Sequence, residues 1–70
     1  MIEKVLEFYP DKLTEISVFL NGSYCGESEV RGLKSYIYSL AEGYNILDIQ
    51  ISSMYLEINI ITDRAKFSRW

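Results

Sequence analysis

The sequence predicts a small α+β domain: one mostly antiparallel sheet, in the order β-β-(β)-α-β-β, with one helix packed on one face. Two observations lead to this fold class. A single amphipathic segment occupies the middle of the chain, and the stretches on both sides of it alternate apolar and polar residues. With 70 residues the chain has room for one hydrophobic core, so we expect a single domain over 1–70.

The first nine residues fit two structures. Four apolar residues have helical spacing: Ile2, Val5, Leu6 and Tyr9. Leu6 and Phe8, with Glu7 between them, also alternate as in a strand. A helix this short is marginal by itself, and a strand partner follows soon after it in the chain. We therefore predict a strand, followed by a turn at 10–11.

The next segment predicts a hairpin. In "TEISVFL" the residues Ile16, Val18 and Leu20 share one face. The Asn21-Gly22 pair follows, and both residues tolerate the positive φ of a type I′ turn. The stretch "SYCGE" then predicts a short return strand.

The segment "SEVRGLKSYIYSLAEG" predicts the helix. Ser28 suits the N-cap, Glu29 suits the positive end of the helix dipole, and Gly43 suits a left-handed stop. A buried stripe is predicted at Val30, Leu33, Ile37, Leu40 and Ala41.

Two alternating runs predict a second hairpin after the helix. "NILDIQIS" places Leu47, Ile49 and Ile51 on one face. "MYLEINIIT" places four apolar residues on one face: Met54, Leu56, Ile58 and Ile60. Since only "SS" separates the two runs, we expect a tight connection between the strands.

The composition argues against an enzyme and against bound cofactors or metals. The sequence has no histidine, which removes the commonest general base and the usual nucleophile pairs. Its only cysteine is Cys25, so a structural zinc site is not expected and no disulfide can form within the chain. The single thiol, the acidic start and the lack of a long apolar stretch predict a cytoplasmic protein without a membrane segment.

Two surfaces are candidates for binding. On the outer side of the predicted helix, small residues form a strip flanked by two tyrosines: Gly32, Ser35, Tyr36, Tyr38, Ser39 and Gly43. An ordinary solvated helix face is the alternative. The sheet face away from the helix would carry Phe19, Tyr55 and Ile61, which we predict for self-association into a homodimer.

The last residues carry a different charge from the rest. The net charge is −3, yet the end of the chain brings together three cations and two aromatic residues: Arg64, Lys66, Phe67, Arg69 and Trp70. Packing against the domain is the favoured interpretation, then an arm that binds a protein partner, then a nucleic-acid contact. General nucleic-acid binding is not expected of an acidic chain.

These features together predict a non-enzymatic protein-binding module. The small size and a composition typical of AT-rich genomes suggest a phage-encoded inhibitor of a host or anti-phage defence protein, with that protein as partner. The alternatives are a small nucleic-acid-associated or DNA-mimicking protein, and a subunit of a structural homo-oligomer.

Overall fold

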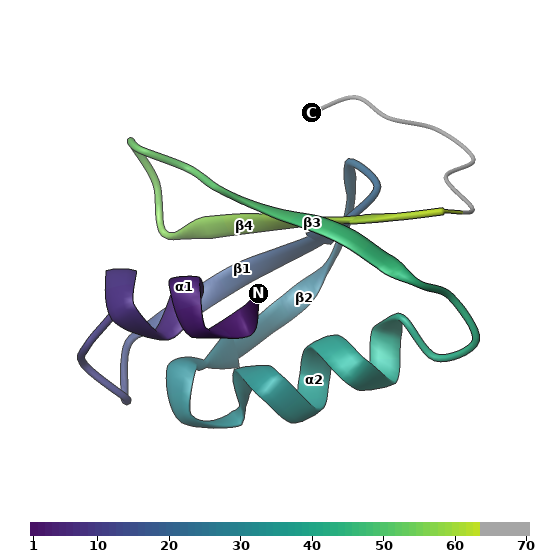
Figure 1. Cartoon of the computed structure of the whole chain (residues 1–70). Coiled ribbons are helices and arrows are strands. Elements are labelled where there is room, and N and C mark those ends of the chain that lie inside the picture. Colours follow the sequence, from purple (N-terminus) through teal and green to yellow (C-terminus); the bar gives the residue numbers. More distant parts are fainter. Residues whose placement is uncertain (64–70) are drawn as a thin grey trace.

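The computed structural model describes residues 1–63, in which a four-stranded mixed sheet carries two helical segments on one face (Figure 1). This confirms the α+β class. The elements in chain order are α1 (Ile2–Phe8), β1 (Glu15–Leu20), β2 (Ser23–Glu29), the 3₁₀ turn η1 (Val30–Gly32), α2 (Leu33–Leu40), β3 (Ile46–Ile51) and β4 (Glu57–Thr62).

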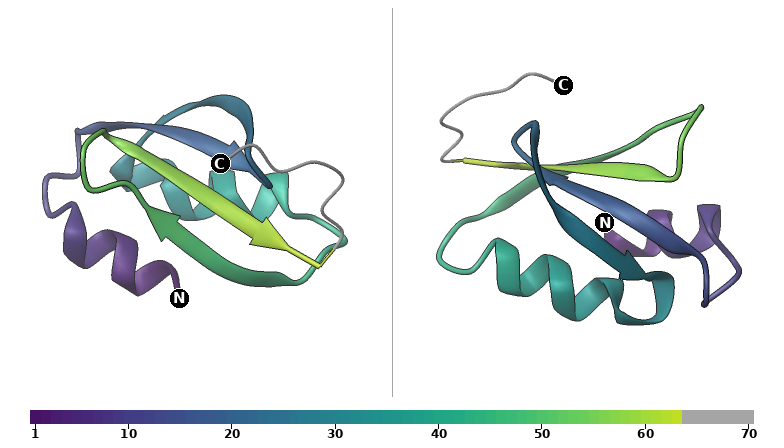
Figure 2. Two further views of the ribbon diagram at one scale, coloured as in Figure 1. Left: turned by 90° about the horizontal axis from the view of Figure 1, so that it is seen from above. Right: turned by 180° about the vertical axis from the view of Figure 1, so that it is seen from behind.

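The strands lie in the order β2-β1-β4-β3. Both outer pairs are antiparallel hairpins, whereas the two central strands, β1 and β4, run parallel. A parallel pair needs a long connection, and here it consists of β2, η1, α2 and β3. Figure 2 shows that α1 and α2 lie apart from each other on the same side of the sheet, so the opposite sheet face is turned away from both helices.

The core lies between the helices and one sheet face. Alternate positions of the strands supply Ile16, Val18, Ile49, Ile58 and Ile60, and the helical segments supply Ile2, Val5, Val30, Leu33 and Ile37. All are nearly or fully buried, so the predicted alternation of the central strands and the predicted apolar stripe of the helix are both confirmed.

Residues 2–8 form a helix, so the predicted strand was wrong. The helix places Ile2, Val5 and Tyr9 against the core, where each is at most 7% exposed. This tertiary burial stabilises a helix that would be marginal alone. Residues 2–8 could not pair with β1 as a strand, because β1 already pairs with β2 on one side and with β4 on the other.

The central helix begins later than predicted. Ser28 lies in β2, opposite Ile16, and its hydroxyl donates to the Glu29 carbonyl at 2.9 Å, so it is not the N-cap. The pairing with β1 continues to Glu29 and thereby delays the helical turn until Val30. The predicted stop is confirmed, because Gly43 has a φ of +86°.

Both hairpins are confirmed. In the first, Asn21 and Gly22 have φ values of +50° and +86°, the positive pair that a type I′ turn requires. In the second, β3 and β4 pair as predicted, but the connection is the five-residue loop 52–56 and not the two serines alone.

Three apolar residues predicted to face the core lie outside it. A bulge between Ile46 and Asp48 lets two residues of β3 occupy the space of one, so Leu47 is 57% exposed. Met54 and Leu56 belong to the loop before β4, where strand alternation does not apply. The loop therefore presents side chains that the sequence pattern had assigned to the core.

Candidate functional site

The two tyrosines of the predicted helix surface lie in different environments. Gly32, Ser35 and Ser39 are exposed on the outer side of η1 and α2, as expected. Tyr36 is half-buried, because its ring reaches back over β2. A Cβ atom at Gly26 would lie only 2.5 Å from the Tyr36 hydroxyl oxygen. The glycine in β2 therefore makes room for this tyrosine.

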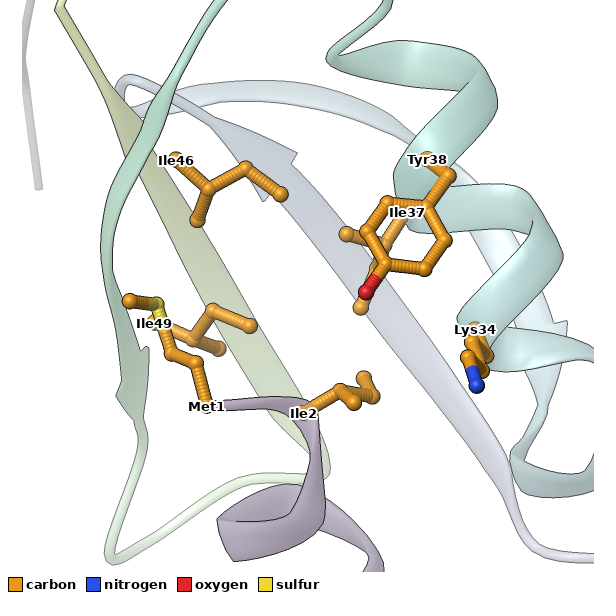
Figure 3. Close-up of a pocket in the computed structure, with 7 residues that line it drawn as sticks. All are labelled: Met1, Ile2, Lys34, Ile37, Tyr38, Ile46 and Ile49. Carbon is orange, nitrogen blue, oxygen red and sulfur yellow. The ribbon is translucent and has the colours of Figure 1, made fainter.

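Tyr38 lies on the other side of α2 and is 55% exposed. Its ring leans over a pocket between α1, α2 and β3, with the hydroxyl group directed into the pocket (Figure 3). The structure thus separates the predicted pair: Tyr36 packs on the sheet, and Tyr38 borders a cavity.

The pocket has a volume of about 220 Å³ and a mainly apolar wall. Each of three elements contributes neighbouring residues, which meet around the cavity in Figure 3: Met1 and Ile2 from the start of the chain, Lys34, Ile37 and Tyr38 from α2, and Ile46 and Ile49 from β3. Ile37 and Ile49 are each 1% exposed, so the floor of the pocket is the hydrophobic core itself.

Charged groups lie on the same segments that line the pocket. The amino group of Met1 donates to the Glu3 carboxylate at 2.7 Å, and this hydrogen bond is the main reason that the pKa of Glu3 is lowered. Lys34 lowers the same pKa weakly through its charge. Lys4 is paired with Asp48 at 3.5 Å, with both side chains exposed. Within residues 1–63, no carboxylate forms an ion pair with Lys34.

The sheet face away from the helices has an acidic row at one end. Ser17 pairs with Glu27 on β2 and with Glu57 on β4, so one carboxylate lies on each side of this serine. Farther along the face, the Asn59 amide donates to the Gln50 side chain at 3.1 Å and accepts from the Gly22 backbone amide at 2.8 Å. This part of the face is a polar hydrogen-bond network.

The residues predicted for self-association are spread along this face. Phe19 and Ile61 are half-buried, and the Phe19 ring meets Tyr24 edge-to-face with 5.5 Å between ring centroids. Tyr55 is 62% exposed in the loop before β4, whereas Ile61 lies near the other end of that strand. The three residues therefore do not form one patch.

The loop between β3 and β4 is an exposed apolar feature of which the sequence identified only Tyr55 as a binding residue. The Ser52 hydroxyl accepts hydrogen bonds from the backbone amides of Met54 and Tyr55 at 3.2 and 3.1 Å. The loop presents three large side chains in succession: Met54 (79% exposed), Tyr55 (62%) and Leu56 (53%). The signal that could have found it was the serine pair, since serine hydroxyls commonly bind the backbone of turns.

A shallow hollow of about 630 Å³ lies beside this loop. Its lining joins Tyr55 and Leu56 to the acidic end of the sheet face, and consists of Thr14, Glu15, Ser17, Glu27, Tyr55, Leu56 and Glu57. Three carboxylates and two exposed apolar side chains thus border one concave surface.

The remaining predicted site residues lie outside the described residues: Arg64, Lys66, Phe67, Arg69 and Trp70. Within 1–63, no group of three or more histidine, cysteine, aspartate or glutamate residues could hold a metal ion. None of the helices in the same range has the length and apolar character needed to cross a membrane.

Comparison with known proteins adds no relative. No family model, curated protein or solved structure matches the chain.

Proposed function

We propose that the chain is a non-enzymatic protein-binding module that docks through its β3–β4 loop. The observation that carries this proposal is the display of Met54, Tyr55 and Leu56, each more than half exposed, on a loop held by the Ser52 turn. A run of large exposed apolar side chains is costly in water, and it is typical of surfaces that bind another protein.

The hollow beside the loop indicates the chemistry of the partner. Glu15, Glu27 and Glu57 line it, and in the described part of the chain no cation forms an ion pair with any of them. A partner that places a lysine or arginine there, beside an apolar pocket for the loop, would be complementary in charge and in polarity. Arginine is favoured, because it forms bidentate pairs with carboxylates and stacks on tyrosine.

The proposal includes the narrower function expected from the sequence, inhibition of a host or anti-phage defence protein. Two features support it: the chain is only 70 residues long, and its sequence combines a docking surface with the lack of any histidine that could serve as a general base. A module of this kind would act by covering a basic and apolar site of its target. The strip of Gly32, Ser35 and Ser39 beside Tyr38 stays a predicted second contact.

The test uses a matched pair of leucines. The full chain serves as bait in a nuclease-treated bacterial lysate, and the captured protein is purified for affinity measurements with Leu56→Ala and Leu47→Ala. These leucines are 53% and 57% exposed, but only Leu56 belongs to the loop. We expect about tenfold weaker binding for Leu56→Ala and unchanged binding for Leu47→Ala.

Salt and charge provide a second readout. Replacing Glu57 with glutamine should weaken binding and reduce its dependence on salt, since the cationic partner group loses one carboxylate. Equal affinities for both leucine variants would refute docking through the loop. Retained binding of Leu56→Ala together with loss for Tyr38→Ala would move the interface to α2.

A further inference from the structure

We infer that the pocket between α1, α2 and β3 binds a small amphipathic carboxylate, with an aliphatic or aromatic body of about ten non-hydrogen atoms. The inference is independent of the proposed docking loop, since none of the pocket residues belongs to the β3–β4 loop or to the acidic hollow.

The size and the wall of the cavity indicate the body of the ligand. Its volume of about 220 Å³ exceeds the roughly 150 Å³ of a dry cavity that binds benzene, and lies below the roughly 300 Å³ at which drug-sized sites begin. The deepest wall residues, Ile37 and Ile49, are fully buried core residues. An apolar group in this space would gain contacts that the side chains around a void otherwise lack.

The mouth of the pocket indicates the charge of the ligand. Two residues of α2 with polar side-chain groups line the pocket, Lys34 and Tyr38, and the Tyr38 hydroxyl is directed inward (Figure 3). Of the neighbouring charges, Met1 is paired with Glu3, and Lys4 with Asp48. Among residues 1–63 Lys34 forms no ion pair, so one negative charge on a ligand is its complement.

A carboxylate is the group whose chemistry matches both polar side chains. One oxygen can accept from the ammonium and the other from the phenol, since lysine and tyrosine both donate. Lys34 and Tyr38 are four residues apart on α2, which places them on the same side of the helix. The apolar body then points away from them toward Ile46 and Ile49 on β3.

The test is a titration of the full chain followed by two-dimensional amide and methyl NMR. The probe is octanoate, and octan-1-ol and octylammonium are the matched neutral and cationic probes. We expect octanoate to bind with a Kd on the order of 1 mM and to shift the signals of Ile37, Ile46 and Ile49. Octan-1-ol should bind more weakly, and octylammonium weakest.

Two variants test separately how the protein recognises the carboxylate group and the apolar part of the ligand. Lys34→Gln should weaken octanoate about threefold and leave octan-1-ol unchanged. Lys12→Gln, an exposed lysine before β1, is the control and should change neither probe. Ile46→Trp should fill the cavity and weaken all probes at least tenfold, in a protein whose spectrum shows it to be folded.

Three results would overturn the inference. The first is the absence of shifts at pocket residues at about 10 mM octanoate, tenfold above the expected Kd. The second is binding of octylammonium as tight as that of octanoate, which would exclude recognition of a carboxylate. The third is an equal loss of affinity in Lys34→Gln and Lys12→Gln, which would mean a general charge effect. If Ile46→Trp does not fold, the probe and lysine comparisons still decide.

Discussion

Replacing Asn21 with glycine separates two roles that this residue combines in the β1–β2 turn. Its backbone φ of +50° is accessible to glycine at no steric cost. Its side chain, however, accepts from the Thr62 backbone amide and donates to the Thr62 hydroxyl, each at 2.9 Å. Both residues are buried, at 8% and 2% exposed. The variant therefore keeps the turn and removes only the two hydrogen bonds.

The expected cost follows from those bonds. Leaving the buried Thr62 amide without its acceptor costs about 1–3 kcal/mol, and the second bond contributes about 1 kcal/mol. A total of about 2–4 kcal/mol is large for this chain, whose whole free energy of unfolding we expect to be about 4–10 kcal/mol. At a few degrees per kcal/mol, the midpoint of thermal unfolding should fall by roughly 10–20 °C.

Chemical denaturation followed by circular dichroism measures this loss. Thr62→Val, which removes the hydroxyl and keeps the shape, completes a double-mutant cycle with Asn21→Gly. We expect a coupling energy of at least about 0.5 kcal/mol, because the two side chains contact each other. A loss below about 0.5 kcal/mol for Asn21→Gly would refute the reasoning and would mean that only the positive φ of this residue matters.

Three further changes test the packing. Gly26→Ala should cost about 1–3 kcal/mol, because the new Cβ would lie 2.5 Å from the Tyr36 hydroxyl at a φ of +156°, and Tyr36→Phe should recover part of that loss in denaturant unfolding. Leu33→Ala should cost about 2–5 kcal/mol, whereas Leu47→Ala should cost less than about 0.5 kcal/mol by the same assay, since they are 0% and 57% exposed. Among the described residues, no group lies in hydrogen-bonding geometry to the buried hydroxyl of Tyr9. Burial raises the pKa of this hydroxyl, and the nearby Glu57 backbone lowers it by a smaller amount. Its neutral form therefore stabilises the fold below about pH 10, and this contribution is lost as the pH rises through the raised pKa. Stability measured from pH 8 to 11 should fall less steeply in Tyr9→Phe, and identical slopes would exclude this linkage.

The sequence predicted the central parts of the fold because their patterns are local. Ile16 and Val18 lie two residues apart, on one side of the predicted strand, and both are fully buried. The stripe from Val30 to Ala41 repeats with helical spacing, so it identified the inner side of α2 without reference to the rest of the chain. The Asn-Gly pair specified its turn through the backbone preferences of two residues.

The candidate site was less predictable from the sequence. Tyr38 was identified as a surface residue, yet the pocket beneath it requires residues from the start of the chain and from β3. Of the exposed loop only Tyr55 was identified, because Met54 and Leu56 continue the alternation of β4 although they precede the first residue of that strand. An alternating pattern indicates which residues share a face, but it does not show where pairing between strands begins.

By itself, the sequence determined the α+β class, the two hairpins, the inner side of the central helix and its glycine stop. These features depend on side-chain periodicity and on backbone preferences that act within a few residues. Only the tertiary structure decided that residues 2–8 form a helix, because both edges of β1 were already paired. It also decided the separation of Tyr36 from Tyr38 and the pairing of Asn21 with Thr62, 41 residues away. Such contacts depend on the space and the hydrogen-bonding groups that distant segments leave, which no local pattern encodes.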